Sequence, residues 1–270
     1  MFRLVSANLN GIRSAATKGF IPWAEAHVAD CIGVQELKAQ VCDMEGRFEH
    51  IAGMKGHFHC AEKRGYSGVG LYTRHEPSDV IMGLGARDPS GEFDREGRYV
   101  ELRFDKPGRK LSVINIYFPS GSSSDERQLA KFRFLAMIEP YLARARAERE
   151  FFLVGDVNIA HQAIDLKNWR GNQKNSGFLP EERAWMTKLL DLQGDIGLVD
   201  VYRRLHPEAT DACYTWWSNR GQARANNVGW RIDYQLATPG LAETALRAGI
   251  YKEQWFSDHA PLTIDYELDL

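Results

Sequence analysis

Short apolar runs that end in polar residues recur along the whole chain. The clearest of them are Phe2–Ala7, Cys31–Val34, Val69–Tyr72, Leu111–Phe118 and Phe151–Val154. They are rich in Val, Ile, Phe and Tyr and are bounded by Gly, Pro or Asn, which is typical of β-strands. A further run, Tyr99–Phe104, is joined to Leu111–Phe118 by the short turn Asp105–Arg109, so these two runs predict an antiparallel pair.

Helical patterns lie between these strands. In Thr17–Ala29 and Asp125–Arg149 the apolar residues recur at helical spacing, and Pro180 followed by two glutamates begins a third helix. This mixture of hairpins and helical crossovers predicts a four-layer α/β sandwich, in which two mixed β-sheets pack face to face with helices outside. No linker or repeat interrupts the chain, so we predict one domain over residues 1–270. The long irregular stretch Ile159–Leu179 predicts a functional loop.

The composition limits the class of protein without deciding its function. With 44% hydrophobic and 26% charged residues the chain can form a sizeable core, and no run of about 20 apolar residues could span a membrane. The four cysteines are scattered and the N-terminus lacks the pattern of a secretory signal, so we expect a reduced, cytoplasmic, monomeric protein. The net charge of −2 argues mildly against a nucleic-acid binder until the basic residues are located.

Polar residues that close buried strands are the main chemical signal, because neighbouring strands end at one edge of a sandwich. In chain order they are Asn8, Glu36, Tyr117, Asp156, Asn158, Asp233, Asp258 and His259. Six of these eight are acids or carboxamides, whose oxygens suit Mg²⁺ or Mn²⁺ and suit zinc poorly. The set predicts a magnesium-dependent hydrolase of phosphate esters.

Each of these residues also has a purely structural interpretation. A single Asp at a strand end is often a cap, Asn8 could belong only to a turn, and Glu36 could be a solvated helix start. The segment Asp156-Val157-Asn158 is harder to explain in that way, because two polar side chains follow Gly155 directly after a buried strand. His57 and His59 alternate on a strand and could share a metal, but no third ligand lies near them in the sequence.

Basic and amide residues interleaved with aromatics occupy the predicted loops. They are Arg13, Lys18, the turn Lys63–Ser67 with Gly65 and Tyr66, the long loop with Lys167, Asn168, Trp169, Arg170, Asn172, Lys174 and Asn175, and Arg220, Arg224 and Arg231 near Trp216, Trp217 and Trp230. Tracking a phosphate backbone and packing against deoxyribose require such residues. Any one charged loop could be simply solvated, but several of them beside one site indicate DNA.

Seven segments, in order, resemble the exonuclease III family of apurinic/apyrimidinic endonucleases, within the DNase I-like phosphoesterases. They are Ser6–Arg13, Gln35–Lys38, Gly65–Gly70, Gly155–His161, Asn172–Phe178, Asn227–Tyr234 and Ser257–Leu262. The resemblance covers essentially the whole chain and implies incision 5′ to abasic sites in double-stranded DNA, with activity on blocked 3′ ends.

The same resemblance implies roles for individual residues. Glu36 would be the principal Mg²⁺ ligand, with Asn8 and Asp258 close to the metal. Asp156 would orient or deprotonate the attacking water beside Asn158, Tyr117 would contact the phosphate, and Asp233 would pair with His259. The residues that it implies for DNA contacts are Arg13, Lys18, Gly65, Tyr66, Ser67, Asn168, Arg170, Asn172, Asn175 and Arg220, and those for the abasic-sugar pocket are Trp216, Trp230 and Ile232.

Two departures and two alternatives accompany this interpretation. Val157 replaces a bulkier residue, and Ser120 stands where a longer amide often contacts phosphate. The main alternative is a nucleic-acid-binding regulator on the same fold that has lost catalysis. The bacterial catabolite repression control protein resembles this family in that way. The second is a lipid or inositol phosphoesterase, which would not need Trp230 or the long Asn- and Lys-rich loop.

Overall fold

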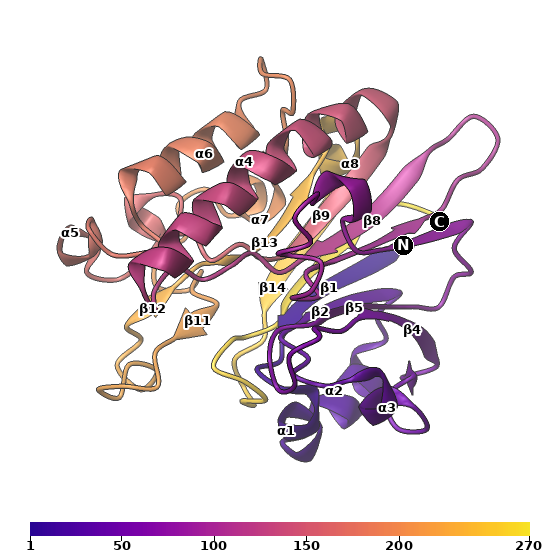
Figure 1. Ribbon diagram of the computed structural model, residues 1–270, viewed down its shortest axis with the longest axis horizontal. Coiled ribbons are helices and arrows are strands. Elements are labelled where there is room, and N and C mark those ends of the chain that lie inside the picture. The colour runs from indigo at the N-terminus through magenta and orange to yellow at the C-terminus, as the bar shows by residue number, and fades with distance from the viewer.

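Two β-sheets form the centre of the computed structural model, which describes residues 1–270 (Figure 1). The first sheet has seven strands in the order β14-β15-β1-β2-β5-β4-β3. Their bounds are β1 Phe2–Asn8, β2 Cys31–Gln35, β3 His50–Ile51, β4 Met54–His59, β5 Val69–Thr73, β14 Ala245–Ile250 and β15 Leu262–Tyr266. Strands β1 and β2 run parallel and the other neighbours antiparallel, so this sheet is mixed.

The second sheet has six strands in the order β10-β13-β9-β8-β7-β6. Their bounds are β6 Asp79–Met82, β7 Tyr99–Arg103, β8 Leu111–Ile116, β9 Glu150–Asp156, β10 Val199–Asp200 and β13 Asp233–Ala237. Here β8 and β9 are parallel and the other neighbours antiparallel. A separate two-stranded ribbon, β11 Trp216–Trp217 with β12 Gly229–Trp230, lies at the edge of the sandwich.

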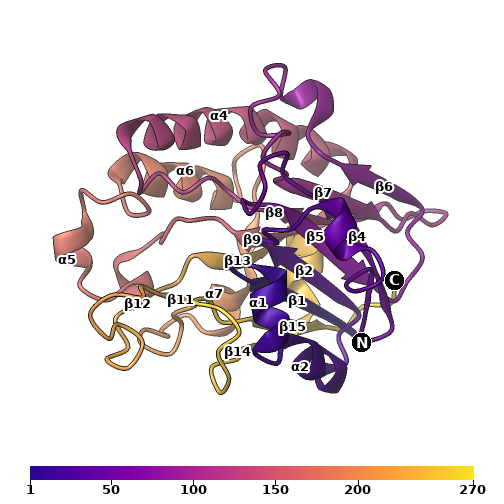
Figure 2. The same cartoon turned by 60° about the horizontal axis from the view of Figure 1, so that its bottom comes forward.

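Helices cover the outer faces of both sheets (Figures 1 and 2). On the seven-stranded sheet lie α1 Ile12–Thr17, α2 Phe20–His27 and α3 Val41–Met44, and on the six-stranded sheet lie α4 Asp125–Glu148 and α6 Pro180–Leu190. The short elements are α5 Trp169–Asn172, α7 Val201–Leu205, α8 Pro239–Glu243 and two 3₁₀ turns, η1 Gly85–Arg87 and η2 Ala163–Asp165. None of the helices combines the length and apolar character needed to cross a membrane.

Buried amide side chains join the two sheets to one another. Asn115 on β8 donates from Nδ2 to the carbonyls of Val34 at 3.0 Å and Gly70 at 2.7 Å, both in the opposite sheet. Gln235 on β13 likewise donates from Nε2 to the carbonyls of Leu4 and Leu262. These groups lie within an otherwise apolar core, where an unpaired amide would destabilise the fold, so the bonds fix how the sheets align.

The predicted four-layer sandwich is therefore the fold of this chain, and the predicted antiparallel pair is β7 with β8. The helix predicted over Thr17–Ala29 is wrong in detail. The chain instead forms α1 and α2, separated at Lys18-Gly19, because Gly19 has a φ of 98° that an α-helix cannot accommodate. The third predicted helix begins at Pro180 as expected. Ile159–Leu179 contains only η2 and α5 and is otherwise irregular.

Candidate active site

The polar residues that close the strands meet at one edge of the sandwich. The seven-stranded sheet contributes Asn8 at the end of β1 and Glu36 directly after β2. The six-stranded sheet contributes Asp156, the last residue of β9, which is paired in register with Asp233 at the start of β13. Because the two sheets face each other, residues distant in sequence come together at this edge.

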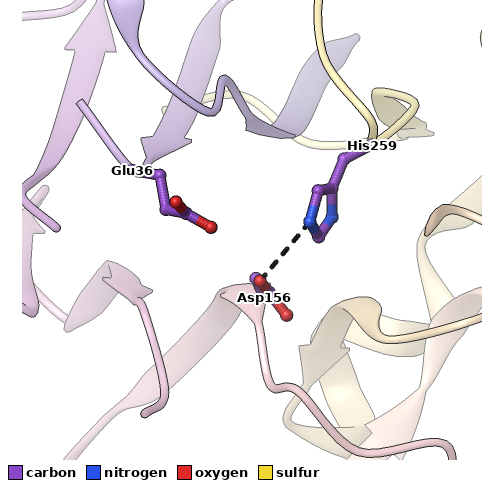
Figure 3. A group of neighbouring side chains, drawn as sticks. All are labelled: Glu36, Asp156 and His259. Atoms are coloured by element: carbon purple, nitrogen blue, oxygen red, sulfur yellow. Dashed lines mark ion pairs between the residues drawn. The ribbon is translucent and has the colours of Figure 1, made fainter. Parts of the chain in front are cut away.

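Glu36, Asp156 and His259 form the centre of the site (Figure 3). One potential ligand atom from each of the three lies within 4.8 Å of the others. In Figure 3 the Glu36 carboxylate and the His259 ring point toward the space above Asp156. This is the one group of three or more potential metal-binding side chains in the chain. His57 and His59 do not belong to such a group, so the possible metal pair on β4 finds no third ligand.

Asp233 and His259 form a buried pair. The Nδ1 atom of His259 lies 2.9 Å from Oδ2 of Asp233, and its Nε2 atom lies 3.8 Å from Oδ2 of Asp156. Burial lowers the pKa of His259, but the charges of Asp233, Asp156 and Asp258 outweigh burial and raise the pKa to about 10. The ring is therefore a cation at neutral pH, with Nδ1 donating to Asp233 and Nε2 directed toward Asp156.

Asp156 is 1% exposed and is held in a fixed orientation. Its Oδ1 accepts the backbone N–H of Asn158 at 2.9 Å, and its Oδ2 accepts the side-chain amide of Asn8 at 2.9 Å. Burial raises the pKa of Asp156 to about 8, against the opposing effect of the His259 charge. Asp156 is thus a much stronger base than an exposed carboxylate.

In its observed side-chain orientation, Asn8 holds the carboxylates of Glu36 and Asp156 in place. Its Nδ2 donates to Glu36 at 3.0 Å as well as to Asp156, while its Oδ1 accepts the N–H of Asn10. Lys38 forms an ion pair with Glu36 at 2.9 Å. Burial raises the pKa of Glu36, but Lys38 and Asn8 outweigh it and hold the pKa below its usual range. The oxygen of Asn8 is turned away from the cluster, so its predicted ligation would require the amide to reorient.

Asp258 lies in the wall of the same cavity but outside the cluster of Glu36, Asp156 and His259. Its two oxygens accept hydrogen bonds from Asn10 at 2.8 Å and from the indole N–H of Trp216 at 3.2 Å. Burial raises the pKa of Asp258, but the His259 charge and these hydrogen bonds keep it below the usual value. Its predicted ligation of a metal stays a prediction.

Tyr117 and Asn158 complete the polar lining of the cavity. The Arg98 guanidinium lies 4.8 Å from the centre of the Tyr117 ring. Burial and the nearby negative charges of Glu36 and Asp156 raise the pKa of Tyr117, so its phenol keeps the proton. Asn158 donates from Nδ2 to the carbonyl of Phe118 at 3.0 Å and has a φ of 57°, a conformation that Asn tolerates well.

The same cavity has an apolar side. Trp216, Trp230 and Ile232 line it, and the rings of Trp216 and Trp230 meet edge to face with their centres 6.3 Å apart. The residues predicted to form the sugar pocket therefore line the same cavity as the carboxylates of Glu36 and Asp156. Ser120 also lines the cavity, whereas Val157 is buried in the core beneath it.

The predicted DNA-contacting residues differ in their access to this cavity. Asn172 and Asn175 line it directly. Gly65, Asn168 and Arg220 are exposed in connecting segments, Lys18 is exposed directly after α1, and Arg13 and Arg170 are exposed on α1 and α5. Tyr66 is half-buried because Arg98 and Arg127 both donate to its hydroxyl at 3.1 Å. Ser67 is 1% exposed, so its hydroxyl points into the loop and is not available to DNA without movement.

A buried ion pair that the sequence did not reveal supports the catalytic loop. Lys131 on α4 and Glu182 on α6 are both fully buried and 2.7 Å apart. Lys131 also donates to the carbonyl of Asn158 at 2.7 Å, while Glu182 accepts the backbone N–H groups of Gly177 and Leu179. The pair therefore ties both helices to the two segments that carry Asn158 and Asn175.

Replacing Lys131 by Met should lower the free energy of unfolding by about 3–5 kcal/mol, because Glu182 is left buried and uncompensated. Urea unfolding measures this change. The matched control is Lys188→Met, which breaks the exposed pair with Glu139 and should change stability by no more than about 0.5 kcal/mol. A Lys131→Met/Glu182→Met double variant should recover part of the loss. Equal losses for Lys131→Met and the control would contradict this role.

A sandwich of two mixed sheets with carboxylates and an imidazolium at one edge is an arrangement suited to the hydrolysis of phosphate esters. A sequence model described as the endonuclease/exonuclease/phosphatase family matches residues 5–259, and the chain belongs to this family. It is 34% identical to an exodeoxyribonuclease of Bacillus subtilis, over 97% of this chain and 98% of the relative. It is 33% identical to exodeoxyribonuclease III of Haemophilus influenzae, over 98% and 100%.

A solved structure supports the assignment of the chain to this family. The AP endonuclease of Archaeoglobus fulgidus superposes with a TM-score of 0.84 at 28% identity, covering 99% of this chain and 100% of that one. The predicted fold and the predicted resemblance to the exonuclease III family are thereby confirmed. Both curated relatives carry the name of an exodeoxyribonuclease.

Proposed function

We propose that this protein is a DNA-repair endonuclease that hydrolyses the phosphodiester bond 5′ to abasic sites in double-stranded DNA and leaves a 3′-hydroxyl. The same site would release blocked 3′ ends and remove 3′ nucleotides. The observation that carries the proposal is the buried cluster of Glu36, Asp156 and His259 in one cavity with Trp216 and Trp230. The names of the relatives, exodeoxyribonuclease and AP endonuclease, support it. We propose a cytoplasmic monomer.

Glu36 is the residue that would chiefly hold a divalent cation, which we propose to be Mg²⁺ with Mn²⁺ as a substitute. The fit rests on the chemistry of the donor: a half-buried carboxylate at the edge of the sandwich, with the oxygens of Asp156 close to it. Asp258 and a reoriented Asn8 are further predicted ligands. A bound cation would supply positive charge to the phosphate oxygens during cleavage.

Asp156 acts as the base in this proposal. It takes a proton from the attacking water as the water oxygen bonds to phosphorus, and the bond from phosphorus to the 3′ oxygen of the preceding nucleotide breaks. The raised pKa of Asp156 favours this transfer, and the amide of Asn158, 3.3 Å from its Oδ2, keeps the carboxylate in place. A single base accounts for only about 10²–10⁴-fold acceleration, so other groups must stabilise the phosphate.

His259 and Tyr117 provide that stabilisation. The His259 cation presents Nε2–H on the side of Asp156, where the negative charge of the phosphate develops. Asp233 keeps the ring charged and fixes its tautomer. Tyr117, whose phenol stays protonated, donates to the phosphate or to the departing 3′ oxygen.

The apolar side of the cavity explains the choice of lesion. A sugar without a base fits against Trp216, Trp230 and Ile232, whereas a nucleotide that retains its base adds a bulky ring that must also leave the helix stack. Exclusion of normal nucleotides thus requires no contact with a particular base.

The catalytically inactive regulator is the less favoured alternative. Loss of catalysis would remove members of the cluster or its supports, yet Glu36, Asp156, Asn158, Asp233, Asp258 and His259 are all present. Asn158 is bonded to Asp156, and Asp233 is bonded to His259. A lipid or inositol phosphoesterase would have no use for the paired tryptophans next to the carboxylates.

A duplex that carries a tetrahydrofuran abasic analogue tests the proposal. The purified protein should incise this duplex on the 5′ side of the analogue with Mg²⁺, and EDTA should abolish incision until excess Mg²⁺ restores it. The products are resolved on a denaturing gel, and an undamaged duplex is the control for lesion selectivity. Binding of the duplex without incision under either Mg²⁺ or Mn²⁺ would favour the regulator instead.

A further inference from the structure

A second cavity lies beside the catalytic one, and Asp258 lines both. Its walls come from the loop between β11 and β12, from the segment 252–258 ahead of β15, and from Lys18 between α1 and α2. Its volume of about 520 Å³ exceeds the roughly 230 Å³ of the catalytic cavity. A cavity of this size accommodates a nucleoside.

One wall of this second cavity is an exposed aromatic ring. Trp255 is 55% exposed and is the only exposed aromatic residue of the chain. It is anchored by its neighbour Phe256, which is buried in the core beneath the seven-stranded sheet. An exposed indole at the wall of a cavity offers a flat apolar face on which a planar ligand can stack.

Arg224 lies against this ring. Its guanidinium carbon is 4.3 Å from the centre of the Trp255 ring and 4.6 Å from that of Trp217, and it donates to the carbonyl of Ser257 at 3.2 Å. These contacts hold the cation at the cavity without an acidic partner in hydrogen-bonding distance. Lys18 provides the second positive charge, and Asp258 is the single acid in the lining. The cavity therefore favours an anionic ligand.

We propose that this cavity is a second DNA subsite, in which Trp255 stacks on an unpaired base next to the cleavage point while Lys18 and Arg224 contact the adjoining phosphates. An aromatic platform flanked by cations is the arrangement that binds unstacked nucleotides with little regard to sequence. The inference rests on the proposed nuclease function and narrows its substrates. Abasic sites and 3′ ends with an unpaired neighbouring nucleotide are bound more tightly than those with paired neighbours.

The test compares two duplexes with the same abasic analogue, one fully paired and one with an unpaired 2-aminopurine beside it. Binding of wild type in EDTA should quench the 2-aminopurine fluorescence, and Trp255→Ala should lose this quenching while Trp255→Phe keeps most of it. In Mg²⁺, Trp255→Ala should raise KM about tenfold for the unpaired substrate and less than threefold for the paired one. The matched control is Leu246→Ala, an exposed apolar residue on β14 that should match wild type.

The outcomes separate this inference from the proposed function. If wild type incises neither duplex, the nuclease proposal fails. If wild type incises both, and Trp255→Ala has the same quenching and the same KM ratio as Leu246→Ala, the second subsite is wrong and the nuclease proposal stands. Loss of quenching in Trp255→Ala together with an Arg224→Gln variant that weakens binding of both duplexes supports stacking and phosphate contact at this cavity.

Discussion

Replacement of Asp156 by Asn is expected to reduce turnover of abasic DNA about 10³-fold or more. The amide has nearly the same shape, and its oxygen can keep the bond from the backbone N–H of Asn158, but it cannot accept a proton from water. Turnover measured with the tetrahydrofuran duplex under saturating Mg²⁺ gives the loss in kcat. Affinity for the same duplex should stay within a few-fold of wild type, because the DNA-contacting loops are unchanged.

The control for this change is Asp195→Asn, which removes an acid of the same type from an exposed loop outside the active-site cavity. It should retain wild-type turnover. An Asp156→Asn variant that still turns over at more than a tenth of the wild-type rate would mean that another group is the base, and the assignment of Asp156 would have to be withdrawn.

Asp233→Asn is the second variant with a large expected effect, a loss of about 10²-fold in kcat at neutral pH. Burial by itself lowers the pKa of His259, and Asp233 is the strongest of the groups that raise it to about 10. Without that carboxylate the pKa falls, so the ring is less protonated at neutral pH and offers the phosphate less positive charge. The profile of kcat against pH provides the measurement.

The direction of the pH effect depends on which protonation states of His259 and Asp156 are active. The active form has His259 protonated and Asp156 ionised, so wild-type activity should rise as Asp156 loses its proton near pH 8 and fall as the pH approaches about 10. The alkaline limb of the Asp233→Asn profile should lie at lower pH. A profile with an unchanged alkaline limb and a uniformly reduced rate would show that Asp233 acts on something other than the His259 proton.

The strands and the convergence of the candidate site residues were predictable because they follow a simple rule of chain geometry. Asn8, Glu36 and Asp156 each come directly after a buried apolar run, and strands of facing sheets end at a common edge. The pairing of Asp233 with His259 came from resemblance, and the 2.9 Å contact agrees with it. The helix predicted over Thr17–Ala29 corresponds to α2, Phe20–His27, and it begins later than predicted because Gly19 has a positive φ.

Other features depend on tertiary contacts that no local pattern contains. Lys131 lies in a helix rich in charged residues, where a solvated lysine is the ordinary case, and only the packing of α6 buries it against Glu182. Ser67 follows Tyr66 in a polar turn and is predicted from the sequence to contact DNA, but the turn folds its side chain inward. No sequence pattern indicated a role for Trp255, because the exposure of an aromatic side chain depends on how the rest of the chain packs around it.

The order of the site residues along the chain has a consequence during protein synthesis. Asn8 and Glu36 are among the first residues to be synthesised, but their sheet is incomplete until β15, the last strand, pairs with β1. The His259 cation lies only three residues ahead of that strand. A ribosome-bound or prematurely terminated chain therefore carries the carboxylates without the His259 charge, so only a chain that has been synthesised through β15 can form the complete site.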